Sequence, residues 1–339
     1  MDAYANAYRL SLESKAYAAQ SIAYRVASLR HFITWCEARG IVRIEGITRP
    51  VLQRYQRHLA QVTGRGGRPL SIATQRNRLT AVRTWFTFLM RENMILYNPA
   101  SALELPRPEK RLPKHTLTAT EAEQVLVRPD INTPQGLRDR ALLEVLYSTG
   151  IRRQELINLR REDVSTVSGV LAVRQGKGKQ DRFVPIGERA LAWLLRYLEE
   201  ARPQLTLRAS PDRVFLDDTG EQWDPNRLSR LVRKYIDQAK LGKSGSCHLF
   251  RHTVATLMLE NGADIRFIQQ MLGHASISTT EIYTHVAIHT LKDIHAATHP
   301  AAGASAREPP TATKETLLAA LDSEAEEEAE GQEVWTPPY

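Results

Sequence analysis

Six residues in the C-terminal half of the chain have side chains that together suit chemistry on a phosphodiester. They supply two guanidiniums, one ammonium, two imidazoles and one phenol, at Arg152, Lys177, His248, Arg251, His274 and Tyr283. Arginine binds an anionic phosphate through two parallel hydrogen bonds, so two arginines from separate segments can hold both non-bridging oxygens. A phenol can then act as the nucleophile, with histidine taking its proton. The set contains no pair of carboxylates, which an acid/base dyad or a metal site would require.

Two of these six assignments have a residue of the same chemical type close by in the chain, so the residue types alone leave the choice open. Arg153 competes with Arg152, and Lys179 competes with Lys177 within the same glycine-rich turn. Consecutive residues of a helix are rotated by about 100°, so Arg152 and Arg153 cannot point the same way. Glu155, three residues after Arg152, has the spacing to hold that arginine in place. The alternative for the arginines is ordinary surface charge.

The other histidines have a simpler interpretation. His248 and His252, like His285 and His289, have the i, i+4 spacing of metal ligands. The His-Glu-x-x-His pattern is missing around them, and no cluster of Asp or Glu accompanies them. We therefore expect no metal ion. The turn around Lys177 lacks the spacing of a nucleotide-binding loop. Four histidines are interpreted as structural: His285, His289, His295 and His299.

Charge points to nucleic acid as the partner. The 339 residues carry a formal net charge of +8. Residues 301–339 contain two basic and nine acidic residues, so the preceding 300 carry +15. A basic body with a separate acidic tail is typical of proteins that bind nucleic acid, although a generally cationic protein is the alternative. No apolar run reaches about 18 residues, and the N-terminus has no signal-peptide pattern. With two distant cysteines, this composition predicts a cytoplasmic protein with no membrane contact.

The N-terminal part, residues 1–105, has the periodicity of a helical domain. Helices are predicted at about 21–40, 48–62 and 71–91, the last capped by Ser71. That last helix places arginines opposite an apolar side, which predicts one core face and one cationic face. We expect three of these arginines to contact DNA: Arg76, Arg78 and Arg83.

A proline-rich basic linker at residues 106–116 separates this domain from the next. The second domain, residues 117–298, begins with a segment that resembles a capping box. Apolar runs at 170–175 and 182–186 flank the turn with Lys177, which predicts a β-hairpin. Helices are predicted at 136–146, 188–200, 225–240, 248–261, 264–271 and 276–288. Residues 299–339 form an acidic tail that we expect to be partly disordered and solvated, with a possible short helix at 315–330.

The motifs around the six residues resemble the tyrosine recombinase (phage integrase) family, and most closely its Xer-type members. The matching segments are Ser148-Thr149-Gly150-Ile151-Arg152, Gly176-Lys177-Gly178, His248-Leu249-Phe250-Arg251, Leu272-Gly273-His274 and Ile282-Tyr283-Thr284. The resemblance covers nearly all of residues 5–290, and its motifs are specific in combination rather than singly. It favours Arg152 over Arg153 and Lys177 over Lys179. Cys247 departs from the pattern, since a proline usually precedes the motif histidine.

The resemblance implies a mainly α fold with a small β-hairpin or sheet, arranged as a two-domain DNA clamp: a helical, SAM-like core-binding domain and an α+β catalytic domain. It implies cleavage of one strand by Tyr283, giving a 3′-phosphotyrosyl link, and resealing by a partner strand through a four-way junction. Neither metal nor ATP nor any other cofactor is required. Partners would be a double-stranded recombination site and three further protomers, as a homo-tetramer or with a second recombinase. A C-terminal segment at 286–298 or 315–330 would dock on a neighbour.

Two other functions fit parts of the sequence. A sequence-specific DNA-binding accessory protein without activity would not need the complete set of six residues. A type IB topoisomerase shares the chemistry but does not exchange strands between sites. The target DNA sequence is not encoded in any motif. A role in integration of a mobile element is the expectation, with resolution of cointegrates or dimers as the other use of the same residues.

Overall fold

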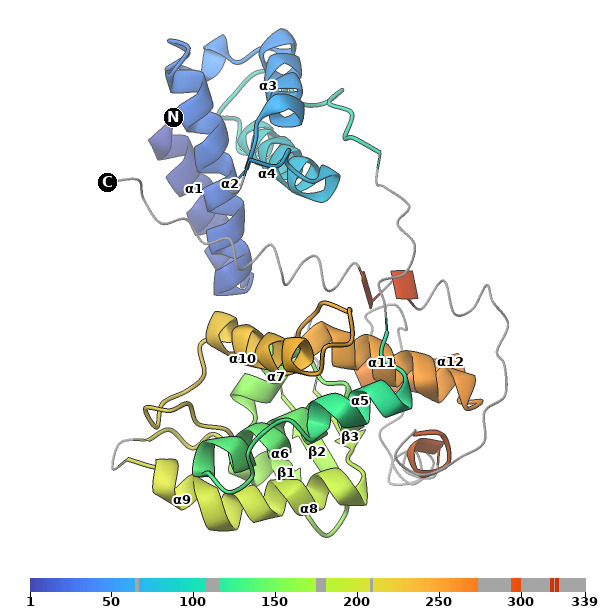
Figure 1. Ribbon diagram of the computed structural model, residues 1–339. Coiled ribbons are helices and arrows are strands. Elements are labelled where there is room, and N and C mark those ends of the chain that lie inside the picture. Colours follow the sequence, from blue (N-terminus) through green and yellow to red (C-terminus); the bar gives the residue numbers. More distant parts are fainter. Residues whose placement is uncertain are drawn as a thin grey trace. The chain divides into compact units, whose positions relative to one another are not determined.

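The computed structural model describes residues 1–64, 67–107, 116–174, 181–207, 210–273, 294–299, 318–319 and 321–322. The chain divides into two compact units, one over Met1–Leu112 and the other over Pro113–Ser323 (Figure 1). Helices dominate both, and the described residues contain one small sheet. The predicted fold class, mainly α with a small β element, is confirmed. No helix in the described ranges is long and apolar enough to cross a membrane.

The elements of the first unit, within its described residues, are helices joined by loops. They are α1 (Asp2–Ser14), α2 (Ala19–Glu37), η1 (Ile44–Gly46), α3 (Arg49–Gln61) and α4 (Ile72–Arg91). The predicted cap of α4 is confirmed, because the hydroxyl of Ser71 accepts a hydrogen bond from the backbone N–H of Thr74 at 3.1 Å. Packed aromatic rings from α2, α3 and α4 form the core of this unit, including Phe32, Trp35, Tyr55, Trp85 and Phe86.

The second unit contains the remaining elements. They are α5 (Ala119–Leu126), α6 (Pro134–Thr149), α7 (Arg153–Asn158), η2 (Arg161–Asp163), β1 (Val164–Ser165), β2 (Val170–Val173), β3 (Arg182–Pro185), α8 (Glu188–Arg196), η3 (Tyr197–Ala201), α9 (Arg202–Leu205), α10 (Pro225–Gln238), α11 (Cys247–Glu260) and α12 (Ile265–Leu272). The predicted helix at 276–288 and the tip of the predicted hairpin lie outside the described residues. The helix predicted at 188–200 is observed as three consecutive segments, with a π-helical turn in the middle.

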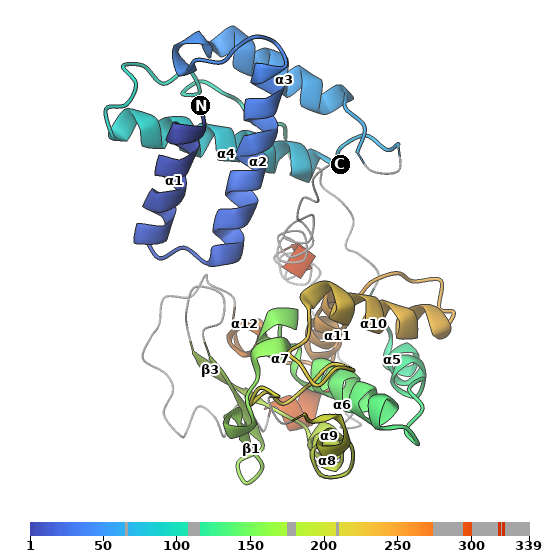
Figure 2. The same ribbon diagram turned by 90° about the vertical axis from the view of Figure 1, so that its left-hand side faces the viewer.

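Helix α6 runs through the middle of this unit, between α8 and α9 on one side and α10 and α11 on the other (Figure 2). All fourteen residues of α6 from Gly136 onward are buried. The helix begins at Thr133, whose hydroxyl accepts the backbone N–H of Gly136. It ends at Gly150, whose φ of +59° lies in the left-handed region that glycine adopts without strain. A buried central helix of this kind gives the loop that follows it a rigid base.

The sheet is antiparallel, in the order β1-β2-β3. Strands β2 and β3 form the predicted hairpin, with Val173 paired to Arg182 at the end nearest the turn. Strand β1 was not predicted, because two residues are too few to show an alternating pattern.

Part of the acidic tail packs on the second unit. Leu318 is buried, and Leu321 belongs to the hydrophobic core of this unit. Asp322 lies with its Oδ1 3.7 Å from Nε2 of the buried His252 on α11. The expectation of a solvated tail is therefore wrong for these residues, since two leucines at i, i+3 spacing supply an apolar side that the acidic composition concealed.

Candidate active site

Arg152 lies in the short connection between α6 and α7. It follows Gly150 and Ile151 and is the N-cap residue of α7, with an extended backbone. Arg152 is therefore not inside a helix, and it differs in direction from Arg153 because the chain turns at this cap. Nη1 of Arg153 donates to Oγ of Ser229 on α10, at 2.9 Å. The two candidate arginines therefore point in different directions, as predicted. The reason is the turn of the chain at the helix cap, not the rotation between consecutive residues of a helix.

The side chain of Arg152 is held on two sides. Its Nη1 donates to Oε1 of Glu155 at 2.9 Å, and its Nη2 donates to the carbonyl of Gly273 at 2.8 Å. Its backbone N–H donates to the other carboxylate oxygen of Glu155 at 2.8 Å. The carboxylate of Glu155 thus both caps the start of α7 and holds the side chain of Arg152. The predicted support of Arg152 by Glu155 is observed.

Arg251 reaches the same place from α11. Its Nη1 donates to the carbonyl of Gly150 at 2.8 Å, and its Nη2 donates to the carbonyl of Leu272 at 2.9 Å. Arg251 is 1% exposed and Arg152 is 6% exposed. The alternative that these arginines are ordinary surface charge is wrong, because surface arginines keep their charge in water.

Three arginines meet the C-terminal end of α12. Carbonyls in the last turn of a helix lack partners within the helix, and this end carries the negative pole of the helix dipole. Here three consecutive carbonyls accept hydrogen bonds from three guanidiniums: Met271 from Arg182, Leu272 from Arg251, and Gly273 from Arg152. The sequence continues directly into His274. The end of α12 therefore gathers cationic groups beside one of the predicted site residues.

Arg182 is the member of this group that the sequence did not reveal. It is the first residue of β3 and is buried. Its Nη1 and Nη2 donate to the two oxygens of Glu155 at 2.8 and 2.7 Å, a bidentate pair. Glu155 is 27 residues earlier in the chain, so no local spacing predicts the contact. The only available signal was a charged residue at the inward-facing start of an apolar strand.

The electrostatics of Glu155 reflect these partners. Burial alone would raise the pKa of its carboxyl. The hydrogen bonds and charge of Arg182, together with the charges of Arg152 and Arg251, outweigh burial and lower the pKa to about 2. Glu155 is therefore a carboxylate at any physiological pH. Its charge balances part of the positive charge that the arginines bring into a buried site.

His248 lies in the first turn of α11, partly buried, and shares a helix face with Arg251. His274, Tyr283, Lys177 and its competitor Lys179 lie outside the described residues. Of the six predicted catalytic residues, the structure thus places three and brings Arg152 and Arg251 to one point. The roles of all six remain predictions.

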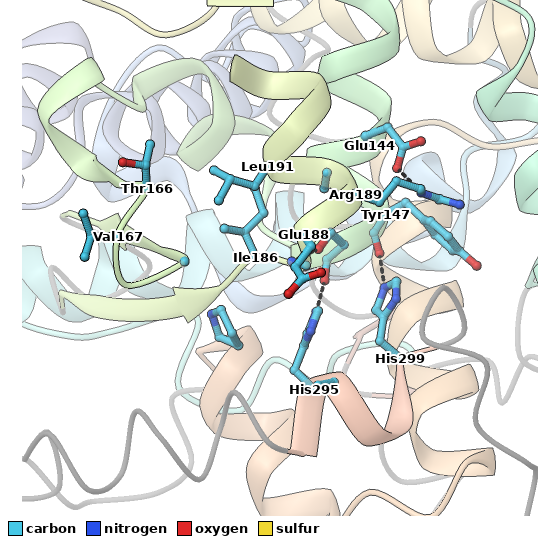
Figure 3. Close-up of a pocket in the computed structure, with 16 residues that line it drawn as sticks. Glu144, Tyr147, Thr166, Val167, Ile186, Glu188, Arg189, Leu191, His295 and His299 are labelled. Atoms are coloured by element: carbon cyan, nitrogen blue, oxygen red, sulfur yellow. Dashed lines mark hydrogen bonds and ion pairs between the residues drawn. The ribbon is translucent and has the colours of Figure 1, made fainter. Parts of the chain in front are cut away.

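Residues 294–299 are anchored to α6. Nε2 of His295 lies 2.7 Å from the carbonyl of Ser148, and Nε2 of His299 lies 2.8 Å from that of Tyr147 (Figure 3). The two rings stack with centroids 4.7 Å apart. Burial lowers the pKa of both imidazoles, and that of His299 falls to about 3 with the charge of His295 contributing. This geometry agrees with the structural interpretation of these two histidines.

These histidines line a cavity of about 570 Å³ together with Glu144, Arg189 and apolar residues of α8 and the sheet (Figure 3). The guanidinium of Arg189 donates to Glu144 at 3.0 Å and to Glu123 at 2.7 Å, which closes one wall. Among the described residues, no group of three or more His, Cys, Asp and Glu side chains could hold a metal ion.

The three arginines predicted to contact DNA do not share one face of α4. Arg76 and Arg83 are seven residues apart and lie on the same side of the helix, away from its core residues. Arg78 is rotated by about 160° from Arg76 and lies on the side of the core, where its charge acts on Tyr55 and His58. Arg78 therefore departs from the single cationic face that the sequence predicted, while its side chain is partly exposed and its contact with DNA stays a prediction. The backbone carbonyl of Pro106 accepts a hydrogen bond from Nη1 of Arg76.

Fold and site together define a class. Residues 115–289 match the phage integrase family, and this segment is more than half of the chain. The chain therefore belongs to the phage integrase family. Tyrosine recombinase XerC 2 of Ralstonia nicotianae is 50% identical over 298 residues, covering 88% of this chain and 86% of the relative. Tyrosine recombinase XerD of Pseudomonas aeruginosa is 40% identical over 278 residues, covering 82% and 90%.

The protein is accordingly an enzyme, a tyrosine recombinase of the Xer type that acts in site-specific recombination. The fold has solved counterparts. A lambda integrase tetramer bound to a Holliday junction has a TM-score of 0.60 at 17% identity, covering 87% of this chain and 77% of that chain. At this identity the likeness concerns the fold alone.

Proposed function

We propose that the protein recombines double-stranded DNA through a covalent intermediate on Tyr283, with Arg152 and Arg251 binding the scissile phosphate. One observation carries the assignment of the arginines. They come from different segments, are both buried, and donate to adjacent carbonyls at the end of α12. Two buried guanidiniums held close together by backbone carbonyls bring concentrated positive charge to one place, which suits the binding of an anion such as a phosphate.

In the first step, the phenol oxygen of Tyr283 attacks the phosphorus. The phosphorus–O5′ bond breaks, and a 3′-phosphotyrosyl bond forms. His248 takes the phenol proton, Lys177 gives a proton to the departing 5′-oxygen, and His274 hydrogen-bonds a phosphate oxygen. Arg152 and Arg251 neutralise the charge that develops on the non-bridging oxygens, the contribution that is usually largest in such reactions.

In the second step, the 5′-hydroxyl of a partner strand attacks the phosphotyrosyl bond. A phosphodiester forms, the phenol is released, and one strand has been exchanged. Two such exchanges pass through a four-way junction. The energy of the original phosphodiester is retained in the tyrosyl bond, so the exchange needs no ATP.

Assembly follows from the need for four cleaved strands. We propose a tetramer on DNA, either of this chain alone or with a second recombinase. The tetrameric lambda integrase on a Holliday junction supports this arrangement. The net charge of +15 on residues 1–300 supports a DNA partner. Arg76, Arg78 and Arg83 remain the proposed DNA contacts of the first unit.

The test is to trap the covalent intermediate. The protein is incubated with fragmented DNA of its source organism, and fragments that stay attached in SDS are sequenced to recover the site. A duplex of that site with a nick a few nucleotides 3′ of the cleavage position then releases the short fragment that carries the free 5′-hydroxyl, so the cleaved strand cannot be resealed. Wild type is expected to accumulate an SDS-resistant adduct, and Tyr283→Phe none. Tyr97→Phe, at an exposed tyrosine of the first unit, is the matched control and keeps the adduct.

Each other outcome has a definite meaning. Binding of DNA by wild type without an adduct would support the inactive accessory protein. An adduct with Tyr283→Phe would overturn the nucleophile. Relaxation of supercoiled DNA without joining of two molecules would support a topoisomerase. The recovered sequence distinguishes integration of a mobile element from resolution of cointegrates or dimers.

A further inference from the structure

Arg182 connects three segments that each adjoin a proposed catalytic residue. It directly follows the hairpin turn that contains Lys177. Its guanidinium holds both oxygens of Glu155, which in turn holds Arg152. Its Nε donates to the carbonyl of Met271 at 3.0 Å, and Met271 comes three residues before His274 in the sequence.

The cost of burying this charge argues for a role beyond packing. A buried ion pair adds little stability over an apolar pair of similar volume, because desolvation offsets the attraction. Arg182 is buried, in a strand that already contributes Val184 to the hydrophobic core. What an apolar residue could not do is hold a carboxylate in one orientation.

We propose that Arg182 is a positioning residue for strand cleavage, acting through Glu155 to set the direction of the Arg152 guanidinium. It moves no proton and need not touch the DNA. With Arg182 in place, Glu155 accepts two hydrogen bonds from Arg182 and two from Arg152, and neither oxygen can rotate away. This inference rests on the proposed function, in which Arg152 binds the scissile phosphate.

Gly273 gives a second way to disturb the same arrangement. Its φ is +71°, and a Cβ added there would lie 2.9 Å from Cζ of Arg182 and 3.0 Å from Nε and Nη1. Its own carbonyl accepts from Arg152. Gly273→Ala therefore pushes on the guanidinium of Arg182 while every charge of the site remains in the protein.

The test compares two substrates in single-turnover cleavage. One is the nicked duplex of the recovered site. The other is the same duplex with a methylphosphonate at the scissile position, where a methyl group replaces one non-bridging oxygen and removes the negative charge. Arg182→Lys keeps the charge but loses the bidentate geometry. The matched control is Arg174→Lys, at the other end of the same hairpin turn, where the guanidinium bonds Asp163.

On the ordinary phosphate, we expect Arg182→Lys and Gly273→Ala each to slow cleavage about 10- to 100-fold, the scale of a small misplacement. On the methylphosphonate, the cleavage rates of both variants are expected to approach that of wild type, because the charge that Arg152 neutralises is absent. Arg152→Ala is expected to behave in the same way. Arg174→Lys matches wild type on both substrates. The double variant Arg182→Lys/Gly273→Ala is expected to be no slower than the slower single variant.

Equal slowing on both substrates, or no slowing by either variant, would overturn the proposal. Should Arg182→Lys fail to fold, Gly273→Ala alone decides by the same comparison. Absence of any adduct with wild type would instead refute the proposed function, so the two failures are distinguishable.

Discussion

Arg152 and Arg251 donate hydrogen bonds to two consecutive backbone carbonyls, those of Gly273 and Leu272, at 2.8 and 2.9 Å. The arginines are 99 residues apart in the chain, and one lies at a helix cap while the other lies inside a helix. Their separation is therefore fixed by backbone atoms of a third element. A site of this kind is organised before substrate arrives, which is the condition for strong electrostatic stabilisation of a transition state.

Loss of either arginine should affect chemistry more than binding. We expect Arg152→Ala and Arg251→Ala each to slow single-turnover cleavage of the nicked site about 100- to 1000-fold, as removal of one preorganised donor does. DNA affinity, measured by fluorescence anisotropy, should fall far less, since many other phosphate contacts remain. Arg266→Ala, at an exposed arginine in the first turn of α12, is the control. Equal losses in affinity and rate would contradict this division.

Glu155 should stabilise the second unit in a pH-dependent way. Its pKa is lowered from 4.5 to about 2 in the folded protein, so the stabilisation is complete above pH 4.5 and disappears as pH falls towards 2. At pH 7, Glu155→Gln is expected to lower the free energy of unfolding by about 3 kcal/mol or more, as breaking a buried ion pair does. Urea unfolding of both proteins at pH 7, 5 and 3 should show the difference narrowing at the lowest pH. A constant difference would refute the assigned cause.

His299 should make the protein sensitive to mild acid. Its pKa is lowered from 6.5 to about 3 by burial first and by the charge of His295 second. The unfolded chain therefore binds this proton more tightly, so stability is full above pH 6.5 and declines as pH falls from 6.5 towards 3. His299→Gln is expected to show a shallower decline of melting temperature over that range. An unchanged slope would count against a buried, neutral His299.

The tail residue Leu321 should contribute to the stability of the second unit. Its side chain is fully buried in the core of that unit. Leu321→Ala is expected to lower the free energy of unfolding by about 2 to 5 kcal/mol, the range for a buried leucine. Leu96→Ala, at a leucine that is 98% exposed, should change it by less than about 0.5 kcal/mol. Equal effects of the two substitutions would show that the tail does not pack as described.

Local signals in the sequence predicted local structure well. The hydroxyl of Ser71 marks the start of α4 through a contact within three residues, and this cap was predicted. The hairpin was predicted because its two apolar runs flank a glycine-rich turn. The motif arginines Arg152 and Arg251 were also found by the sequence, although their burial was not.

Local signals in the sequence could not predict the contacts between distant segments. The pairing of Arg182 with Glu155 spans 27 residues, and nothing near either residue indicates it. The side of α4 on which Arg78 lies follows from the rotation between successive residues of a helix, whereas the prediction placed all three arginines on one face. The burial of Leu321 depends on the hydrophobic core of the second unit, which is built from residues far from it in the chain, and the acidic residues around it suggested exposure to water instead.

The carbonyls at the end of α12 have a further consequence for engineering. Backbone oxygens are common to every amino acid, so side-chain changes at positions such as Met271 and Leu272 alter packing without removing the acceptors themselves. Changes of length act differently. One residue inserted or deleted within α12 would turn its final carbonyls by about 100° and move them about 1.5 Å along the axis. The arginines would then face the wrong atoms, so α12 should tolerate exchange of residues far better than any change in their number.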